Sequence, residues 1–172
     1  LKTMKTISLA EIDTNDIKRK IQQAPYKNIE IQELRSFIEE KLEKLLEKIA
    51  VDLHGTTELT VGDKTINFAP PFKRVTIYDA IKEHTGFDIS NMDEDGLRDV
   101  CKQLHIDVPP TIGKGKLIDE IFGATSESKY IQPTFIIDYP IEMSPLTKKH
   151  RSKEGLVERF ELMVNGKELA NA

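Results

Sequence analysis

The distribution of apolar residues along the chain predicts a long amphipathic helix near its beginning. Between Glu30 and about Val51, apolar side chains recur every three or four residues, and Glu and Lys fill most positions between them. This spacing places the apolar residues on one face of a helix and the charged residues on a solvated face. The members of the apolar stripe are Ile31, Leu34, Phe37, Ile38, Leu42, Leu45, Leu46 and Ile49.

Alternating patterns further along the chain predict two β-hairpins and one short strand. The first hairpin covers residues 58–68, and the second covers residues 160–172 with Asn165-Gly166 between its strands. Asn-Gly is a strong signal for a two-residue hairpin turn, because both positions must adopt a positive φ. An apolar run over residues 135–137 predicts the remaining strand.

Helical patterns lie between the two hairpins. Thr76 has the place of an N-cap for a short helix that ends near Gly86. Two further apolar stripes lie within residues 90–124, so we expect a helical insertion there. The fold class that follows is α+β: a partial antiparallel sheet with an N-terminal amphipathic helix and a helical insertion.

Composition and charge argue against several classes of protein. The chain has 172 residues, with 25 Lys+Arg against 29 Asp+Glu and a formal net charge of −4, which argues against strong nonspecific nucleic-acid binding. No run approaches the roughly 20 apolar residues that a membrane-spanning helix needs. Cys101 is the only cysteine, which excludes a disulfide scaffold and fits a buried position on its helix. No secretory pattern opens the chain, so a cytoplasmic location is expected.

The insertion carries one candidate binding function. It resembles a SAP-like helix–extended loop–helix module, and such modules often bind DNA through basic residues where the second helix begins. Lys114 and Lys116 occupy that place, but acidic residues surround them and weaken phosphate binding. A small structural insertion is therefore favoured. A nucleic-acid or protein binding module that uses this insertion or the N-terminal helix stays open as the alternative function.

The last hairpin carries a candidate metal site. Simple alternation around its turn pairs Met163 with Glu168 and Glu161 with Ala170, so these four side chains share one face. Glu161 and Glu168 are then diagonal neighbours, with backbones roughly 7–8 Å apart. Two such carboxylates can share Mg²⁺ when a phosphate completes its shell. The alternative is a solvated sheet face with two weakly repelling glutamates.

The motifs together carry a family resemblance. The most specific stretch is PTFIIDYPIEMSPLTKKHRSKEGLVERFELMVNGKELANA, and the supporting stretches are APYKNIE, HGTTELTVGDKTINF, PFKRVTIYDAIKEHTGFDIS and GKGKLIDEIFG. On these stretches, residues 24–172 resemble the central part of the catalytic domain of class II lysyl-tRNA synthetases of bacterial type. We assign residues 24–172 to a partial synthetase catalytic domain that includes the 90–124 insertion, and leave residues 1–23 as an unassigned N-terminal arm.

The resemblance implies a function and site residues. The intact enzyme would activate lysine with ATP to an adenylate and transfer it to tRNA, usually as a homodimer with magnesium. The paired acidic ligands for magnesium and ATP match Glu161 and Glu168, and the lysine-pocket asparagine matches Asn171. Simple alternation places Asn171 on the opposite face from the glutamates, so a bulge or strong twist near Leu169 would be needed.

Several family features have no match in this sequence. They are the anticodon-binding β-barrel, the dimer-forming first motif and the arginine-bearing second and third motifs. We therefore expect a fragment of a lysine–tRNA ligase that is inactive as an isolated chain. We also expect an open sheet edge at the last strand, through which the chain self-associates. A further alternative is a remnant that pairs with a full-length synthetase through this edge.

Overall fold

The computed structural model describes residues 31–147 and 149–172, so the predicted arm at 1–23 and the APYKNIE stretch lie outside the described residues. The chain divides into a unit of residues 1–37 and a unit of residues 38–172, and the second unit contains almost all described elements. These elements are α2 (Ile31–His54), β1 (Glu58–Val61), β2 (Lys64–Asn67), β3 (Lys73–Thr76), α3 (Ile77–Thr85), α4 (Glu94–Gln103), α5 (Lys114–Thr125), the 3₁₀ turns η3 (Glu127–Lys129) and η4 (Ile141–Met143), β4 (Thr134–Pro140), β5 (Leu156–Val164) and β6 (Lys167–Asn171).

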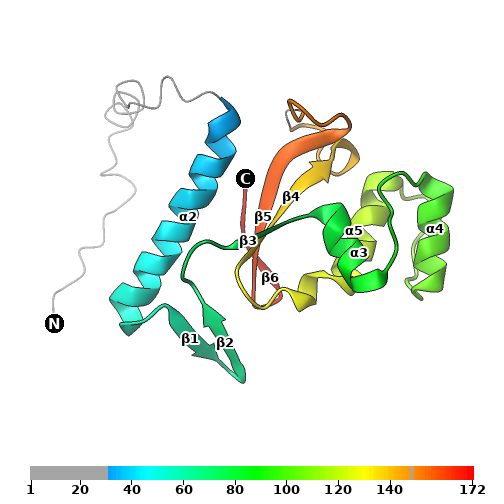
Figure 1. Ribbon diagram of the computed structural model, residues 1–172. Coiled ribbons are helices and arrows are strands. Elements are labelled where there is room, and N and C mark those ends of the chain that lie inside the picture. Colours follow the sequence, from blue (N-terminus) through cyan, green and yellow to red (C-terminus); the bar gives the residue numbers. More distant parts are fainter. Residues whose placement is uncertain (1–30, 148) are drawn as a thin grey trace, which may run out of the picture. The chain divides into compact units, whose positions relative to one another are not determined.

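The main sheet has four strands in the order β3-β4-β5-β6 (Figure 1). The α+β class is confirmed, and β4, β5 and β6 are antiparallel as predicted. Two details of the predicted sheet are wrong. The first hairpin, β1–β2, forms a separate two-stranded sheet, and the unpredicted strand β3 pairs with β4 in parallel. A parallel pair requires a long crossover, and the helices α3, α4 and α5 supply it.

Alternation along the strands separates two apolar cores. On one face of the sheet, Phe135 and Phe160 pack in a T-shaped pair with ring centroids 5.2 Å apart, joined by Leu162 and by Leu42 and Leu46 of α2. The next residues along β4 and β5, such as Ile136 and Met163, belong to the core that includes α3, α4 and α5. Helices thus cover both faces of the sheet.

The predicted solvated face of α2 is wrong at two positions. Glu39 and Glu43 are 2% and 5% exposed, because Arg74 of β3 binds both carboxylates. Arg74 Nε lies 2.6 Å from Glu39, and Nη1 lies 2.9 Å from Glu43. The apolar stripe is correspondingly only partly covered, and Leu45 remains 53% exposed.

The predicted boundaries of the short helix α3 are confirmed. The Thr76 hydroxyl accepts a hydrogen bond from the Asp79 amide at 3.1 Å, which satisfies one of the free donors at the start of the helix. Gly86 ends the helix with a φ of 81°, a left-handed conformation that glycine adopts without steric cost. Cys101 of α4 is fully buried, as expected for an apolar filler.

The insertion packs closely on the segment that follows β4. Gly115 of α5 lies against the backbone of η4, and a Cβ at this position would be 2.3 Å from the Glu142 carbonyl oxygen. Side chains would hold the two segments apart, so the contact requires glycine. Arg98 of α4 fixes the loop before α5 by donating to the carbonyls of Pro109 and Pro110 at 3.2 and 3.0 Å.

The tip of the β5–β6 hairpin is docked rather than free. Asn165 and Gly166 have φ values of 55° and 72°, as the predicted two-residue turn requires. Their amides donate to the carbonyls of Ile131 and Tyr130, each at 2.9 Å. The turn is therefore bound to the segment that leads into β4.

Candidate functional site

The register of the β5–β6 hairpin determines which side chains meet. The predicted pairs Val164–Lys167 and Met163–Glu168 are confirmed, but the register then shifts by one residue. Leu162 lies opposite Ala170 and Glu161 opposite Asn171, with Leu169 as the extra residue of a bulge. Simple alternation was wrong from Leu169 onward because it allowed no bulge.

The bulge brings Asn171 to the face that carries Glu161. Phe160 and Ala172 exchange both backbone hydrogen bonds, at 2.7 and 3.1 Å, so the adjacent pair Glu161–Asn171 is a non-hydrogen-bonded pair. Side chains approach more closely in such pairs. Asn171 Nδ2 accordingly lies 3.4 Å from Glu161 Oε1. Ala170, which we predicted to share the face with Glu161, packs instead in the core next to α2.

Arg159 is the centre of this group of side chains. It lies two residues before Glu161 on β5 and therefore on the same face. Its Nη2 donates to Glu161 Oε1, and its Nε donates to Asn171 Oδ1 at 3.2 Å. Its Nη1 donates to the Ser144 hydroxyl at 2.9 Å, and its guanidinium lies over the Tyr139 ring, 4.8 Å from the centroid.

The local electrostatics match this arrangement. Burial raises the pKa of the Glu161 carboxyl above its ordinary value, the Tyr139 hydroxyl and the charge of Arg159 oppose this shift, and the charges of Glu168 and Asp119 add to it. Burial also raises the pKa of Tyr139, with the charge of Glu161 adding to the effect.

Glu168 completes the pair of carboxylates on this face. It lies opposite Met163 and is exposed, two strand positions from Glu161. Two oxygen donors fit Mg²⁺, which is commonly bound by one or two carboxylates together with phosphate oxygens and water. Within residues 31–147 and 149–172, no group of three or more Asp, Glu, His or Cys side chains is arranged to hold a metal ion.

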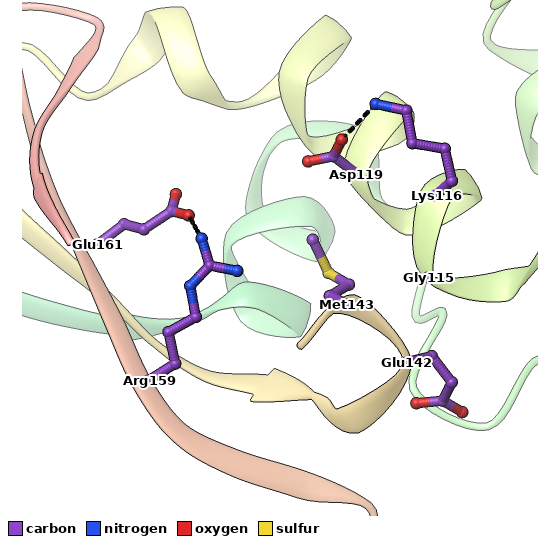
Figure 2. Close-up of a pocket in the computed structure, with 7 residues that line it drawn as sticks. All are labelled: Gly115, Lys116, Asp119, Glu142, Met143, Arg159 and Glu161. Atoms are coloured by element: carbon purple, nitrogen blue, oxygen red, sulfur yellow. Dashed lines mark hydrogen bonds and ion pairs between the residues drawn. The ribbon is translucent and has the colours of Figure 1, made fainter. Parts of the chain in front are cut away.

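A cavity of about 340 Å³ adjoins Arg159 and Glu161. Figure 2 shows these two side chains on the strand, with Lys116 and Asp119 of α5 drawn on the helix of the insertion. The lining residues are Gly115, Lys116, Asp119, Glu142, Met143, Arg159 and Glu161. The helical insertion thus contributes one wall of the cavity beside the candidate site, which its sequence pattern did not indicate.

The two lysines at the start of α5 are paired with carboxylates. Lys116 Nζ lies 2.6 Å from Asp119 and 3.1 Å from Glu120, and Lys114 Nζ lies 3.8 Å from Glu142. This pairing leaves little net positive charge for a phosphate backbone. The contacts favour the structural interpretation of the insertion over the SAP-like binding module.

The loop between β4 and β5 is tied to a buried carboxylate. Asp138 is fully buried with a φ of 57°, at the point where the β4–β5 register shifts. Lys153 pairs with Asp138, and His150 Nε2 lies 3.7 Å from the same carboxylate. His150 Nδ1 accepts hydrogen bonds from the amides of Ser152 and Lys153, each at 3.1 Å. These contacts connect the loop to β4.

The sequence analysis assigned no role to Arg159, Ser144 or Tyr139. The alternation of β5 does place Arg159 beside Glu161, so that signal was present in the sequence. Ser144 and Tyr139 come from other segments, and only the fold brings them to the same guanidinium.

Comparisons with known proteins place the chain in a family. Residues 24–172 match the family described as tRNA synthetases class II (D, K and N). A lysine–tRNA ligase from Porphyromonas gingivalis (strain ATCC BAA-308 / W83) is 63% identical over 130 residues, which are 76% of this chain and 22% of that protein. Lysine–tRNA ligases from Azobacteroides pseudotrichonymphae and Christiangramia forsetii are each 58% identical over 130 residues, covering 76% of this chain and 26% and 23% of those proteins.

The chain thus spans roughly a quarter of the length of these curated relatives. Among the described residues, no helix is long and apolar enough to cross a membrane. The family match covers more than half of the chain, including all four strands of the main sheet. The chain therefore belongs to the class II tRNA synthetases of the D, K and N group.

Proposed function

We propose that this chain supplies part of the catalytic domain of a lysine–tRNA ligase. The observation that carries the proposal is the 58–63% identity to lysine–tRNA ligases over 130 residues. The reaction joins lysine to the α-phosphate of ATP with release of pyrophosphate, and then transfers lysine from this adenylate to the 3′ end of its tRNA with release of AMP. Lysine, ATP and tRNA are thus the proposed substrates of the whole enzyme, and a homodimer is its proposed assembly.

The face of β5 and β6 that bears Glu161, Glu168 and Asn171 is the proposed substrate face. Glu161 and Glu168 would hold Mg²⁺, with ATP phosphates as the remaining ligands. When bound, the ion would neutralise phosphate charge during adenylate formation. Asn171 would contact lysine, and its pairing with Glu161 supports a common site for all three residues.

The residues present have separate tasks in this proposal. Arg159 and Asn171 both hold Glu161 through one carboxylate oxygen, Oε1. Glu168 is exposed and can turn toward a ligand that arrives from solvent.

A chimera tests the proposed activity. The matching 130-residue segment of the Porphyromonas gingivalis ligase is replaced by the segment of this chain that aligns with it. We expect lysine-dependent ATP–pyrophosphate exchange and tRNA charging at rates near those of the parent ligase. The chimera with Asn171→Ala should lose lysine affinity. A folded chimera that charges no tRNA would contradict the proposal.

The metal pair is tested on the chain itself. Mn²⁺ prefers the same oxygen ligands as Mg²⁺ and broadens nearby NMR signals. We expect the broadening to centre on the amides of Glu161 and Glu168, and either Glu→Gln change should weaken it. The matched control is Asp95→Asn, in the acidic run at the start of α4, which should change nothing. Broadening that centres on that run, or ignores both Glu→Gln variants, would exclude the pair.

A further inference from the structure

We propose that Arg159 is a positioning residue that holds Glu161 and Asn171 in one fixed arrangement for the ligands of this face. The inference rests on the proposed function, because it assigns those ligands to Glu161 and Asn171. Arg159 itself is not assigned contact with a substrate. It acts through the carboxylate and the amide on either side of it.

The first observation is that one guanidinium makes four separate contacts. Nη2 and Nε bind Glu161 and Asn171, which belong to different strands. Nη1 binds Ser144, and the flat face of the group lies over the Tyr139 ring. The planar fork of arginine allows these contacts at the same time, whereas the lysine ammonium is a single point charge on a flexible stem.

The second observation concerns the orientation of the Asn171 amide. Arg159 Nε has only a proton to offer, so it requires the amide oxygen, Oδ1, at 3.2 Å. The carboxylate of Glu161 accepts only, so it requires the amide nitrogen, Nδ2, at 3.4 Å. The two charged neighbours therefore select one of the two amide orientations. With Oδ1 already bound to a cation, Asn171 presents an N–H to a ligand and suits an acceptor group.

The third observation is that Arg159 is itself anchored. Ser144 is buried, at 7% exposure, and Tyr139 is 1% exposed in the core that includes α3, α4 and α5. A guanidinium held against two buried groups cannot follow a displaced carboxylate into solvent. Arg159 thus fixes Glu161 on β5 and Asn171 on the edge strand β6 to the core.

Positioning and simple charge compensation predict opposite effects on metal binding. A cation beside Glu161 disfavours Mn²⁺, so an Arg159 that only compensates charge would weaken binding, and its removal would strengthen it. A positioning residue fixes the carboxylate, and the loss of such a hydrogen-bonding partner typically reduces metal affinity by 10- to 100-fold. The sign of the change therefore separates the two roles.

The experiment uses the ¹⁵N-labelled chain with Arg159→Gln, Arg159→Lys and the control Arg151→Gln. Arg151 forms an ion pair with Glu158, a residue of β5, the strand that carries Arg159. Arg151→Gln therefore removes a comparable ion pair and leaves the contacts of Asn171 in place. The first readout is the contact between the Asn171 side-chain amide and the Glu161 side chain by nuclear Overhauser effect, without metal. The second is Mn²⁺ affinity from paramagnetic broadening.

We expect both Arg159 variants to lose the Asn171–Glu161 contact and to bind Mn²⁺ about tenfold more weakly, while Arg151→Gln matches the parent. Full rescue by Arg159→Lys would overturn the proposal, because charge alone would then suffice. Tighter Mn²⁺ binding by Arg159→Gln would overturn it as well. If the parent chain binds no Mn²⁺, the proposed metal pair fails, and the Asn171–Glu161 contact still decides the role of Arg159.

Discussion

Gly115 provides a sharp test of how the insertion packs on the sheet domain. Replacing it with alanine adds one Cβ, which would lie 2.3 Å from the Glu142 carbonyl oxygen and 2.6 Å from its carbonyl carbon. Both are backbone atoms, so no flexible side chain can move away to make room. The helix α5 and the turn η4 must separate instead, and buried contacts of α5 are lost with them.

The expected cost follows from two opposing effects. Overpacking a core with an added methyl group typically costs 1–3 kcal/mol, and a backbone clash belongs at the upper end of that range. Alanine regains up to about 1 kcal/mol through helix propensity, less in the first turn where Gly115 lies. We therefore expect Gly115→Ala to lower the free energy of unfolding by about 2 kcal/mol.

The same helix offers a matched control. Gly123 is exposed, and the nearest atom to its added Cβ is a side-chain oxygen of Glu127 at 3.8 Å, an ordinary contact. Gly123→Ala should therefore raise the free energy of unfolding by about 0.5–1 kcal/mol through helix propensity alone. Two identical substitutions in one helix should thus change stability in opposite directions.

Urea unfolding followed by circular dichroism measures both variants. With an m-value of about 2 kcal/mol/M, the midpoint should fall by about 1 M for Gly115→Ala and rise by about 0.3–0.5 M for Gly123→Ala. The m-value should not change, since the same surface is exposed on unfolding. If Gly115→Ala matches or exceeds the stability of the parent chain, the close packing of α5 on η4 is refuted.

Four further predictions concern other parts of the fold. Arg74→Met should lower the free energy of unfolding by about 2 kcal/mol in urea titrations, because it leaves two buried carboxylates of α2 without their cation; an unchanged midpoint would contradict this. Glu161 and Asn171 should show a strong Hα–Hα nuclear Overhauser effect, as a non-hydrogen-bonded pair requires, and its absence would exclude the bulged register. The pKa of Asp88 should be about 2, below its ordinary 3.8, because Lys82 donates to it at 2.8 Å. Stability from this pair should be present above pH 3.8 and lost as the pH falls toward 2. Lys82→Met should raise the pKa of Asp88 in a ¹³C titration only part of the way to its ordinary value, because Ser90 still donates to the carboxylate. The outer edge of β6 has no partner strand among the described residues, so sedimentation should show association that grows with concentration, and a strict monomer would count against it.

Much of the fold was predictable because its signals are local. The two hairpin turns, the capped helix α3 and the apolar run of β4 each follow from a few neighbouring residues. The parallel pairing of β3 was not predictable, since a strand of four residues carries little pattern and its partner lies far along the chain. The same distance hid the burial of the two glutamates of α2, both of which bind Arg74 of β3.

The candidate site also has a part that could be predicted from local sequence and a part that could not. Glu161 and Glu168 were predicted on one face, and their placement depends only on the turn and the first strand pairs. The exact partner of Glu161 was mispredicted, because a bulge at Leu169 cannot be located by alternation. The family resemblance supplied Asn171, and the conflict between resemblance and alternation already indicated where a bulge was needed. The contribution of the insertion to the cavity depends on tertiary packing, which no local pattern encodes.

The docked tip of the β5–β6 hairpin has a thermodynamic consequence for ligand binding. A free hairpin would sample many twists and shears, and a ligand bridging its two strands would have to remove that freedom at the moment of binding. Here the turn is bonded to residues 130 and 131, and the far end is closed by the Phe160–Ala172 pair. The conformational entropy of both strands is therefore lost during folding, before any ligand arrives. A cation or substrate on this face retains correspondingly more of its interaction energy as affinity.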